Sequence, residues 1–226
     1  MRREKRMLDK IISTALGEVG YVEKASNAFL YDKTANAGDA NYTKYWAEIK
    51  PEYQGQPWCA AFVSWVFMEA LGKQTAEKLL KHFPYVYVPT IANLFERHAN
   101  PKRGDIVCFY RNGEFVHTGI VTSVSGDRFE TVEGNTSGGS SVISNGGGIC
   151  KKSYYNSKLP GTKFVRPDYE SAEPRELTSV NDIVWELRER GIVSETDKWL
   201  QKLQTDTDAY WLARKTVRFL RDKKRV

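Results

Sequence analysis

Four polar residues of this 226-residue chain combine the types needed for nucleophilic catalysis: Cys59, His117, Glu133 and Asn135. A cysteine attacks a carbonyl carbon as the thiolate, and a neighbouring histidine favours that form. The histidine in turn needs a carboxylate or an amide that fixes the orientation and tautomer of its ring. The sequence therefore predicts a site for acyl transfer, provided that the fold brings these side chains together.

Cys59 stands near the start of a long apolar run, residues 57–67. Proline is favoured at the first helical position, which predicts a start at Pro57, and Gly72 is a typical stop. We expect a helix buried on most sides, with Cys59 in its first turn, where the helix dipole and free N–H groups favour a thiolate. An active Cys59 should be at least partly exposed. The alternative is a passive core residue, because free cysteine is often buried.

An oxyanion formed during acyl transfer needs hydrogen-bond donors close to the nucleophile. The backbone N–H of Cys59, at the start of the helix, is the natural candidate. Gln54 or Gln56 could add a side-chain donor, and the sequence does not choose between them.

His117 and Glu133 lie on consecutive expected strands joined by a turn at 125–127, and opposed residues of an antiparallel pair share a face. A three-residue turn places His117 opposite Asn135 and Gly119 opposite Glu133. A two-residue turn points His117 away from Glu133, because a one-residue slip exchanges the faces. The catalytic interpretation therefore predicts an odd-length turn or an equivalent bulge.

Each of these residues also has an ordinary interpretation. His117 fits a buried strand histidine bonded to a backbone carbonyl, Glu133 a solvent-facing strand residue, and Asn135 a turn residue that ends the strand. The presence of all of them, in the chain order Cys, His, Glu, Asn, favours catalysis over these separate explanations.

The elements that must position the site are loops, helices and strands, each with its own sequence pattern. Long polar loops, expected at 21–56 and 136–148, are candidate walls of a cleft. Apolar residues at helical spacing predict helices, and runs rich in β-branched and aromatic residues predict strands, with Asn112-Gly113 as a hairpin turn. The expected helices, besides the one with Cys59, are 5–19, 42–48 and 90–98, and the strands are 104–110, 115–124, 128–135, 149–155 and 163–166.

The chain is expected to hold two domains. Residues 1–169 form the candidate catalytic domain, and 170–176 a linker rich in proline and acidic residues. Residues 177–226 carry three helical stripes, which predict a small three-helix module. This module could bind a cell wall, form oligomers or simply cap the catalytic domain.

Composition narrows the remaining possibilities. The net charge of +6 is compatible with nucleic acid, an anionic membrane or an anionic cell wall, but we find no nucleic-acid motif and no transmembrane segment. Cys108 and Cys150 each fall in an expected strand and are expected to be structural. Three cysteines do not make a disulfide framework. Asp32 and Asp39 lack the spacing of a calcium loop, so we predict neither a metal nor a cofactor.

Four sequence blocks resemble the CHAP domain, a family of cysteine, histidine-dependent amidohydrolases/peptidases: PWCAAFVSWVF at 57–67, PKRGDIVCF at 101–109, HTGIV at 117–121 and VEGNT at 132–136. The resemblance covers about residues 8–169. It implies a papain-like α+β fold, with N-terminal helices packed on an antiparallel sheet. It also implies that Cys59 is the nucleophile and His117 the general base, oriented by Glu133 and Asn135.

The expected function is that of a peptidoglycan hydrolase, an amidase or endopeptidase that cuts an amide bond of the stem peptide or cross-bridge. The helical tail looks like C-terminal modules of hydrolases from Gram-positive bacteria and their phages. Because no secretory signal is visible, we expect a phage or prophage endolysin, made in the cytoplasm and acting on the wall after release. The alternatives are a catalytically silent wall-binding or assembly protein and an intracellular cysteine protease.

Overall fold

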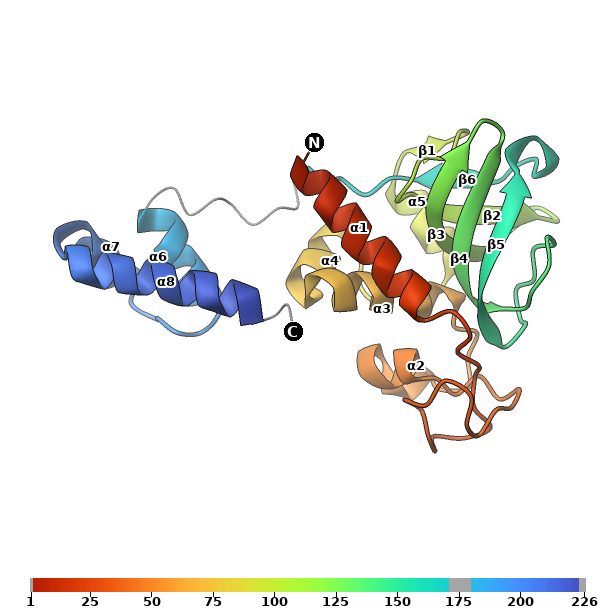
Figure 1. Cartoon of the computed structure of the whole chain (residues 1–226), viewed down its shortest axis with the longest axis horizontal. Coiled ribbons are helices and arrows are strands. Elements are labelled where there is room, and N and C mark those ends of the chain that lie inside the picture. The colour runs from red at the N-terminus through yellow and green to blue at the C-terminus, as the bar shows by residue number, and fades with distance from the viewer. Residues whose placement is uncertain (1, 171–179, 224–226) are drawn as a thin grey trace. The chain divides into compact units, whose positions relative to one another are not determined.

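The computed structural model describes residues 2–170 and 180–223, and the chain divides into two compact units, Met1–Ala172 and Glu173–Val226. The first unit combines helices with an antiparallel sheet (Figure 1), so the prediction of an α+β fold is confirmed. The papain-like arrangement stays a prediction. Except for Glu170, the predicted linker at 170–176 lies outside the described residues.

Helix α3, Cys59–Leu71, is the centre of the first unit. It begins at Cys59, two residues after the predicted start at Pro57, and Gly72 ends it with a φ of 82°. Residues 59–67 are buried on every side of the helix, which explains their nearly continuous apolar sequence. The helix packs against β3 and β4, and α1 packs against the helix.

The other helical segments of this unit surround α3 and the edges of the sheet. These helical segments are α1 (Arg2–Gly17), α2 (Lys44–Ile49), η1 (Pro51–Tyr53), α4 (Lys73–Leu80), α5 (Val88–Leu94) and η2 (Asn156–Lys158). The polar segment between α1 and α2 is mainly turns and bends, as expected for a loop.

Within the described residues, six antiparallel strands form one sheet in the order β1-β6-β2-β3-β4-β5. Asn112 and Gly113 form the turn between β2 and β3, with φ values of 52° and 94°, which confirms the predicted hairpin. The strands are β1 (Arg97–His98), β2 (Ile106–Arg111), β3 (Glu114–Ser125), β4 (Arg128–Thr136), β5 (Gly148–Tyr155) and β6 (Lys163–Val165).

The register of β3 and β4 decides which face His117 occupies. The turn between them has two residues, because Ser125 pairs with Arg128, and this register would separate His117 from Glu133. A β-bulge at Thr122 then shifts the pairing by one residue, so that Ile120 lies opposite Val132. The predicted bulge is therefore present, and it returns His117 and Glu133 to one face.

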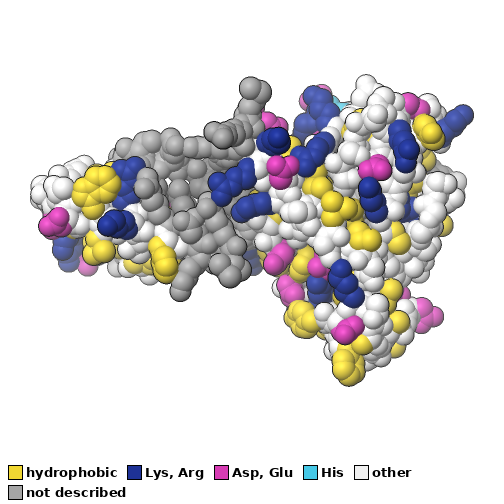
Figure 2. All heavy atoms as spheres, viewed as in Figure 1, with side chains coloured by type: hydrophobic (Ala, Val, Ile, Leu, Met, Phe, Trp, Pro, Cys, Tyr) yellow, Lys and Arg dark blue, Asp and Glu magenta, His cyan; other side chains and the backbone are white. Residues whose placement is uncertain are grey.

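The second unit has helices α6 (Val180–Glu189), α7 (Thr196–Thr205) and α8 (Thr207–Lys223). Its apolar core includes Ile183, Leu187, Leu203 and Val217. Figure 2 shows side chains of this unit, in which exposed apolar and basic groups lie near one another on α7 and α8. No helix in either described range is long and apolar enough to cross a membrane.

Candidate active site

Cys59 is the first residue of α3, so its backbone N–H has no partner inside the helix and can point at an incoming carbonyl oxygen. The residue is only 6% exposed, which makes it more enclosed than the sequence suggested. The enclosure follows from its neighbours, because Trp58 and Ala60 are themselves buried and His117 interacts with the thiol.

His117 joins the nucleophile to a carboxylate. Its Nε2 lies 3.0 Å from Oε2 of Glu133, and neither side chain reaches solvent. Burial lowers the pKa of His117, but hydrogen bonding to Cys59 and Glu133, and their charges, outweigh burial and raise it to about 9. His117 is therefore an imidazolium at neutral pH, the form that stabilises a neighbouring thiolate.

The Nδ1 atom of His117 is the ring nitrogen that remains for the Cys59 thiol, since Glu133 occupies Nε2. Nδ1 is fully buried and has no well-aligned hydrogen-bond partner among the described residues. The thiol is thus close enough to affect the pKa of the ring without an ideal hydrogen bond. Catalytic hydrogen bonds are often long or poorly aligned before substrate binds.

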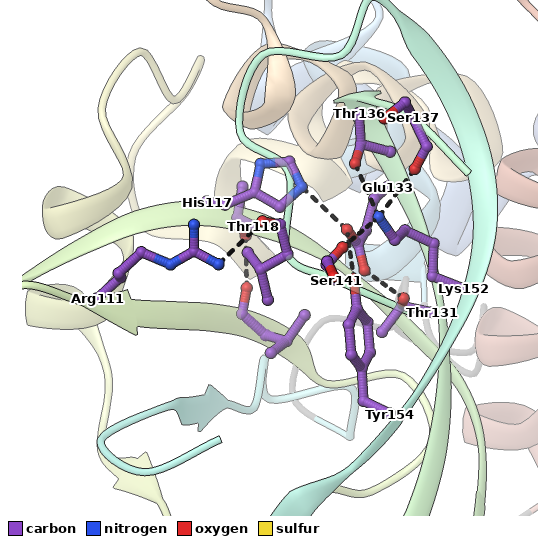
Figure 3. A network of polar contacts seen from close by, with 12 residues as sticks. Arg111, His117, Thr118, Thr131, Glu133, Thr136, Ser137, Ser141, Lys152 and Tyr154 are labelled. Atoms are coloured by element: carbon purple, nitrogen blue, oxygen red, sulfur yellow. Dashed lines mark hydrogen bonds and ion pairs between the residues drawn. The ribbon is translucent and has the colours of Figure 1, made fainter. Parts of the chain in front are cut away.

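Glu133 is itself held by two further side chains of the sheet (Figure 3). Thr131 donates to its Oε1 at 2.5 Å, and Tyr154 donates to its Oε2 at 3.2 Å. Burial, followed by the charge of Glu133, raises the pKa of Tyr154, so the phenol keeps its proton and remains a donor. With His117, these donors fix both carboxylate oxygens.

Gly119 provides the space for Glu133. A Cβ at this position would lie 2.5 Å from Cγ of Glu133 and 2.9 Å from the backbone oxygen of Val132. Neither distance is possible without movement, so the absence of a side chain at Gly119 lets the Glu133 side chain approach β3 closely.

Asn135 is also buried, but it is not bonded to the other site residues. It has a φ of 54° and lies where the β4–β5 pairing is irregular, and both polar atoms of its side chain lack hydrogen-bond partners within residues 2–170 and 180–223. The structure thus brings Cys59, His117 and Glu133 into contact, and it leaves the buried Asn135 amide without a hydrogen-bond partner among the described residues. The predicted role of Asn135 in orienting His117 stays a prediction.

The loop after Asn135 is fastened by two cations. Lys152, only 3% exposed, donates to the backbone oxygens of Ser137 at 2.8 Å and Ser141 at 2.6 Å. Arg111 donates to the backbone oxygen of Val142 at 3.0 Å. These bonds hold the predicted cleft wall against the sheet.

The two glutamines proposed as oxyanion donors differ in their contacts. The Gln54 side chain bonds to the backbone of Thr43 through both its oxygen and its nitrogen, and its nitrogen also bonds to Asn27. Gln56 is exposed, and its backbone oxygen accepts from Trp46 Nε1. Of the two side chains, only that of Gln56 is left available.

The described part of the chain contains no candidate metal site of His, Cys, Asp or Glu side chains. No group of three or more His, Cys, Asp or Glu side chains converges there in a way that could hold an ion. Oδ1 of Asp32 accepts from the N–H groups of Thr34 and Ala35, which is a local turn contact.

Sequence reasoning missed Thr131, Gly119 as a spacer, Tyr154 and Lys152. Thr131 had a readable signal, since it lies two residues before Glu133 on the same strand face. Tyr154 and Lys152 had none, because their places depend on the β4–β5 register.

Comparison with known proteins bears on the same region. The CHAP domain family model matches residues 51–135, a range that includes Cys59, His117, Glu133 and Asn135. No curated protein and no solved structure matches the chain. The match supports a CHAP-domain protein. The CHAP family is generally hydrolytic, and its match suggests peptidoglycan amidase or peptidase activity.

Proposed function

We propose that this protein is a peptidoglycan hydrolase that cleaves an amide bond of the stem peptide or cross-bridge through an acyl-enzyme on Cys59. The observation that carries the proposal is the buried chain of contacts from Cys59 to His117 and from His117 to Glu133. The CHAP match over residues 51–135 supports peptidoglycan as the substrate class.

In the proposed reaction the Cys59 thiolate attacks the amide carbonyl, and the new oxyanion receives a hydrogen bond from the Cys59 backbone N–H. His117 gives its proton to the leaving amine when the C–N bond breaks. The neutral imidazole then takes a proton from water, whose oxygen attacks the thioester and releases the acid. Glu133 keeps its hydrogen bond to the ring and stabilises the imidazolium at the start and end of the cycle.

The test is digestion of purified Gram-positive walls, followed by turbidity and by the release of new amino termini. We expect Cys59→Ala and His117→Ala to lose activity by at least about 100-fold, while His82→Ala, which removes an exposed histidine, keeps it. Mass spectrometry of the fragments identifies the bond. Full activity in either site variant would contradict the mechanism, and cleavage of proteins but not walls would point to a cysteine protease.

We further propose an endolysin role, in which the protein is made in the cytoplasm and reaches the wall after the membrane is opened. The support for this role is the resemblance of the helical tail to C-terminal modules of hydrolases from Gram-positive bacteria and their phages. Expression inside a Gram-positive host should leave cells intact until a membrane lesion is induced. Spontaneous lysis without a lesion would argue against it.

For residues 177–226 we propose binding to anionic wall polymers. Trp211 and Leu212 are 49% and 68% exposed on α8, Arg214 lies over the Trp211 ring, and residues 214–225 are mostly basic. Exposed aromatic and basic groups together suit an anionic polymer. Trp211→Ala with Leu212→Ser in the full chain should weaken wall pull-down and leave turnover of a small soluble peptide unchanged. Unchanged pull-down would refute this role.

A further inference from the structure

Three carboxylates among the described residues of the first unit are buried, and one of these three lacks a cation. Asp105 bonds to Arg166 through both oxygens, and Glu133 bonds to His117. Glu23, only 3% exposed, has no ion-pair partner in the part of the chain that the structure describes. A carboxylate that is mostly enclosed by protein usually has an opposite charge beside it, so Glu23 calls for an explanation beyond packing.

The Glu23 carboxylate is held rigidly on one side and open on the other. Oε2 accepts from Nε1 of Trp58 at 2.8 Å, and the backbone N–H of Glu23 donates to Gly147 at 2.7 Å. Oε1 makes no hydrogen bond within the described ranges, and it is not one of the fully buried atoms without a partner. It therefore reaches solvent as a fixed and unused acceptor.

Gly147 leaves this oxygen uncovered. A Cβ there would rest 3.4 Å from Cδ and 3.6 Å from Oε1 of Glu23, so any side chain would begin to cover the carboxylate. The φ of Gly147, 76°, is also one that glycine adopts without strain. The opening is thus built into the backbone at this position.

Glu23 is linked by a hydrogen bond to the residue before the nucleophile. The indole that binds it belongs to Trp58, the residue before Cys59, and the same ring packs beneath Gly134, which precedes Asn135. The Trp58 side chain alone therefore separates the Glu23 carboxylate from the backbone next to Cys59. An extended peptide covers about 3.3 Å per residue, so the subsite would recognise a group only a few residues from the scissile bond.

We propose that Glu23 is a binding subsite for an ammonium group of the peptide substrate, either a free amino terminus or the side-chain amine of a diamino acid. The ammonium supplies the missing charge and donates to Oε1, while Trp58 keeps Oε2 in place. This inference rests on the proposed function, because it names the substrate group recognised beside the same nucleophile.

The experiment compares Gram-positive walls, and soluble peptide fragments prepared from them, before and after acetylation of their free amines. For the wild-type protein we expect acetylation to lower kcat/KM and fragment affinity about tenfold or more. Glu23→Gln should show a similar loss with untreated material and no further loss after acetylation. Glutamine keeps the length of the side chain and can still accept from Trp58.

Glu48→Gln is the matched control. Its carboxylate also accepts from an indole, Nε1 of Trp65 at 2.8 Å, but it lies on α2 and pairs with no atom of the subsite. We expect this variant to distinguish untreated from acetylated material as the wild-type protein does.

Two results would overturn the subsite. One is equal wild-type affinity for untreated and acetylated fragments, which needs no variant and so does not depend on the folding of Glu23→Gln. The other is a Glu23→Gln defect of the same size on both materials, which would mean that Glu23 only positions Trp58. Failure of the wild-type protein to cleave untreated walls, with amine-dependent fragment binding intact, would instead contradict the proposed function alone.

Discussion

His117 on β3 and Glu133 on β4 share a hydrogen bond of 3.0 Å between Nε2 and Oε2, at a place in the sheet where both side chains are fully buried. Because this bond occupies Nε2, the ring presents Nδ1 to Cys59. The carboxylate thereby decides which nitrogen faces the nucleophile and stabilises the charge that the ring carries.

Replacing Glu133 by glutamine should remove the negative charge of the carboxylate while keeping the shape of the side chain. We expect kcat to fall by roughly two to four orders of magnitude, with little change in KM, measured on walls or soluble fragments. Glu130→Gln is the control on the same strand, since Glu130 pairs with Lys151 and is partly exposed. Equal losses in both variants would mean that the defect is not specific to the His117 contact.

The raised pKa of His117 should make stability depend on pH. The pKa lies at about 9 in the folded protein, against 6.5 for an unperturbed histidine, which represents the unfolded chain. The proton is therefore held more tightly in the folded state, and this contribution is complete below pH 6.5 and lost as the pH rises through 9. Urea unfolding from about pH 6 to about pH 10 should show the decline, and His117→Gln should flatten it. The same decline in both proteins would assign it to other groups.

Gly119→Ala should damage the site although it replaces none of the catalytic side chains. The added methyl would collide with Glu133 and the Val132 backbone, so we expect a loss of about 1–3 kcal/mol in unfolding free energy and at least about a tenfold loss in kcat. Gly17→Ala, where a Cβ meets nothing within 4 Å, is the control. Wild-type activity and melting temperature in Gly119→Ala would show that Glu133 has more freedom than the structure indicates.

Tyr154→Phe removes one of the donors to Glu133 and leaves Thr131 and His117 in place. The loss of one hydrogen bond is worth about 1 kcal/mol, so we expect kcat to fall about fivefold. The pH profile of activity should also move, because a less firmly held Glu133 changes the stabilisation of the His117 imidazolium. Tyr155→Phe, which changes the exposed neighbour, should leave both unchanged. A lower melting temperature with an unmoved pH profile would reduce Tyr154 to a packing role.

Much of the fold could be read from local patterns. The apolar run after Pro57, the stop at Gly72 and the Asn112-Gly113 turn each depend on neighbouring residues, and each is present in the structure. The short strand β1 was missed, since the sequence predicted a helix through His98. Arg97 and His98 instead pair with β6, far along the chain, and no local signal reports that contact.

In the site, too, some features follow from local sequence patterns, and others depend on contacts far along the chain. Strand parity was enough to relate His117 to Glu133, but it allowed either an odd turn or a bulge, and the position of the bulge at Thr122 depends on how the whole hairpin packs. The enclosure of Cys59 was also beyond the sequence, because burial at a helix start depends on what covers it. Asn135 is the clearest example, since its turned backbone leaves its amide unpaired in a strand position that predicted contact.

The bulge at Thr122 is a single extra residue that sets which face of the sheet carries His117. Deleting Thr122 would remove the bulge and leave Val121 opposite Thr131, so His117 would stay with Glu133. Pairing Thr122 with Thr131 instead, with no residue removed, would carry His117 to the opposite face. Removing one residue from each strand at the tip of the hairpin would keep His117 and Glu133 together. Shortened or grafted versions of this domain should therefore preserve the pairing of Val121 with Thr131 before they preserve the identity of the hairpin's outer residues.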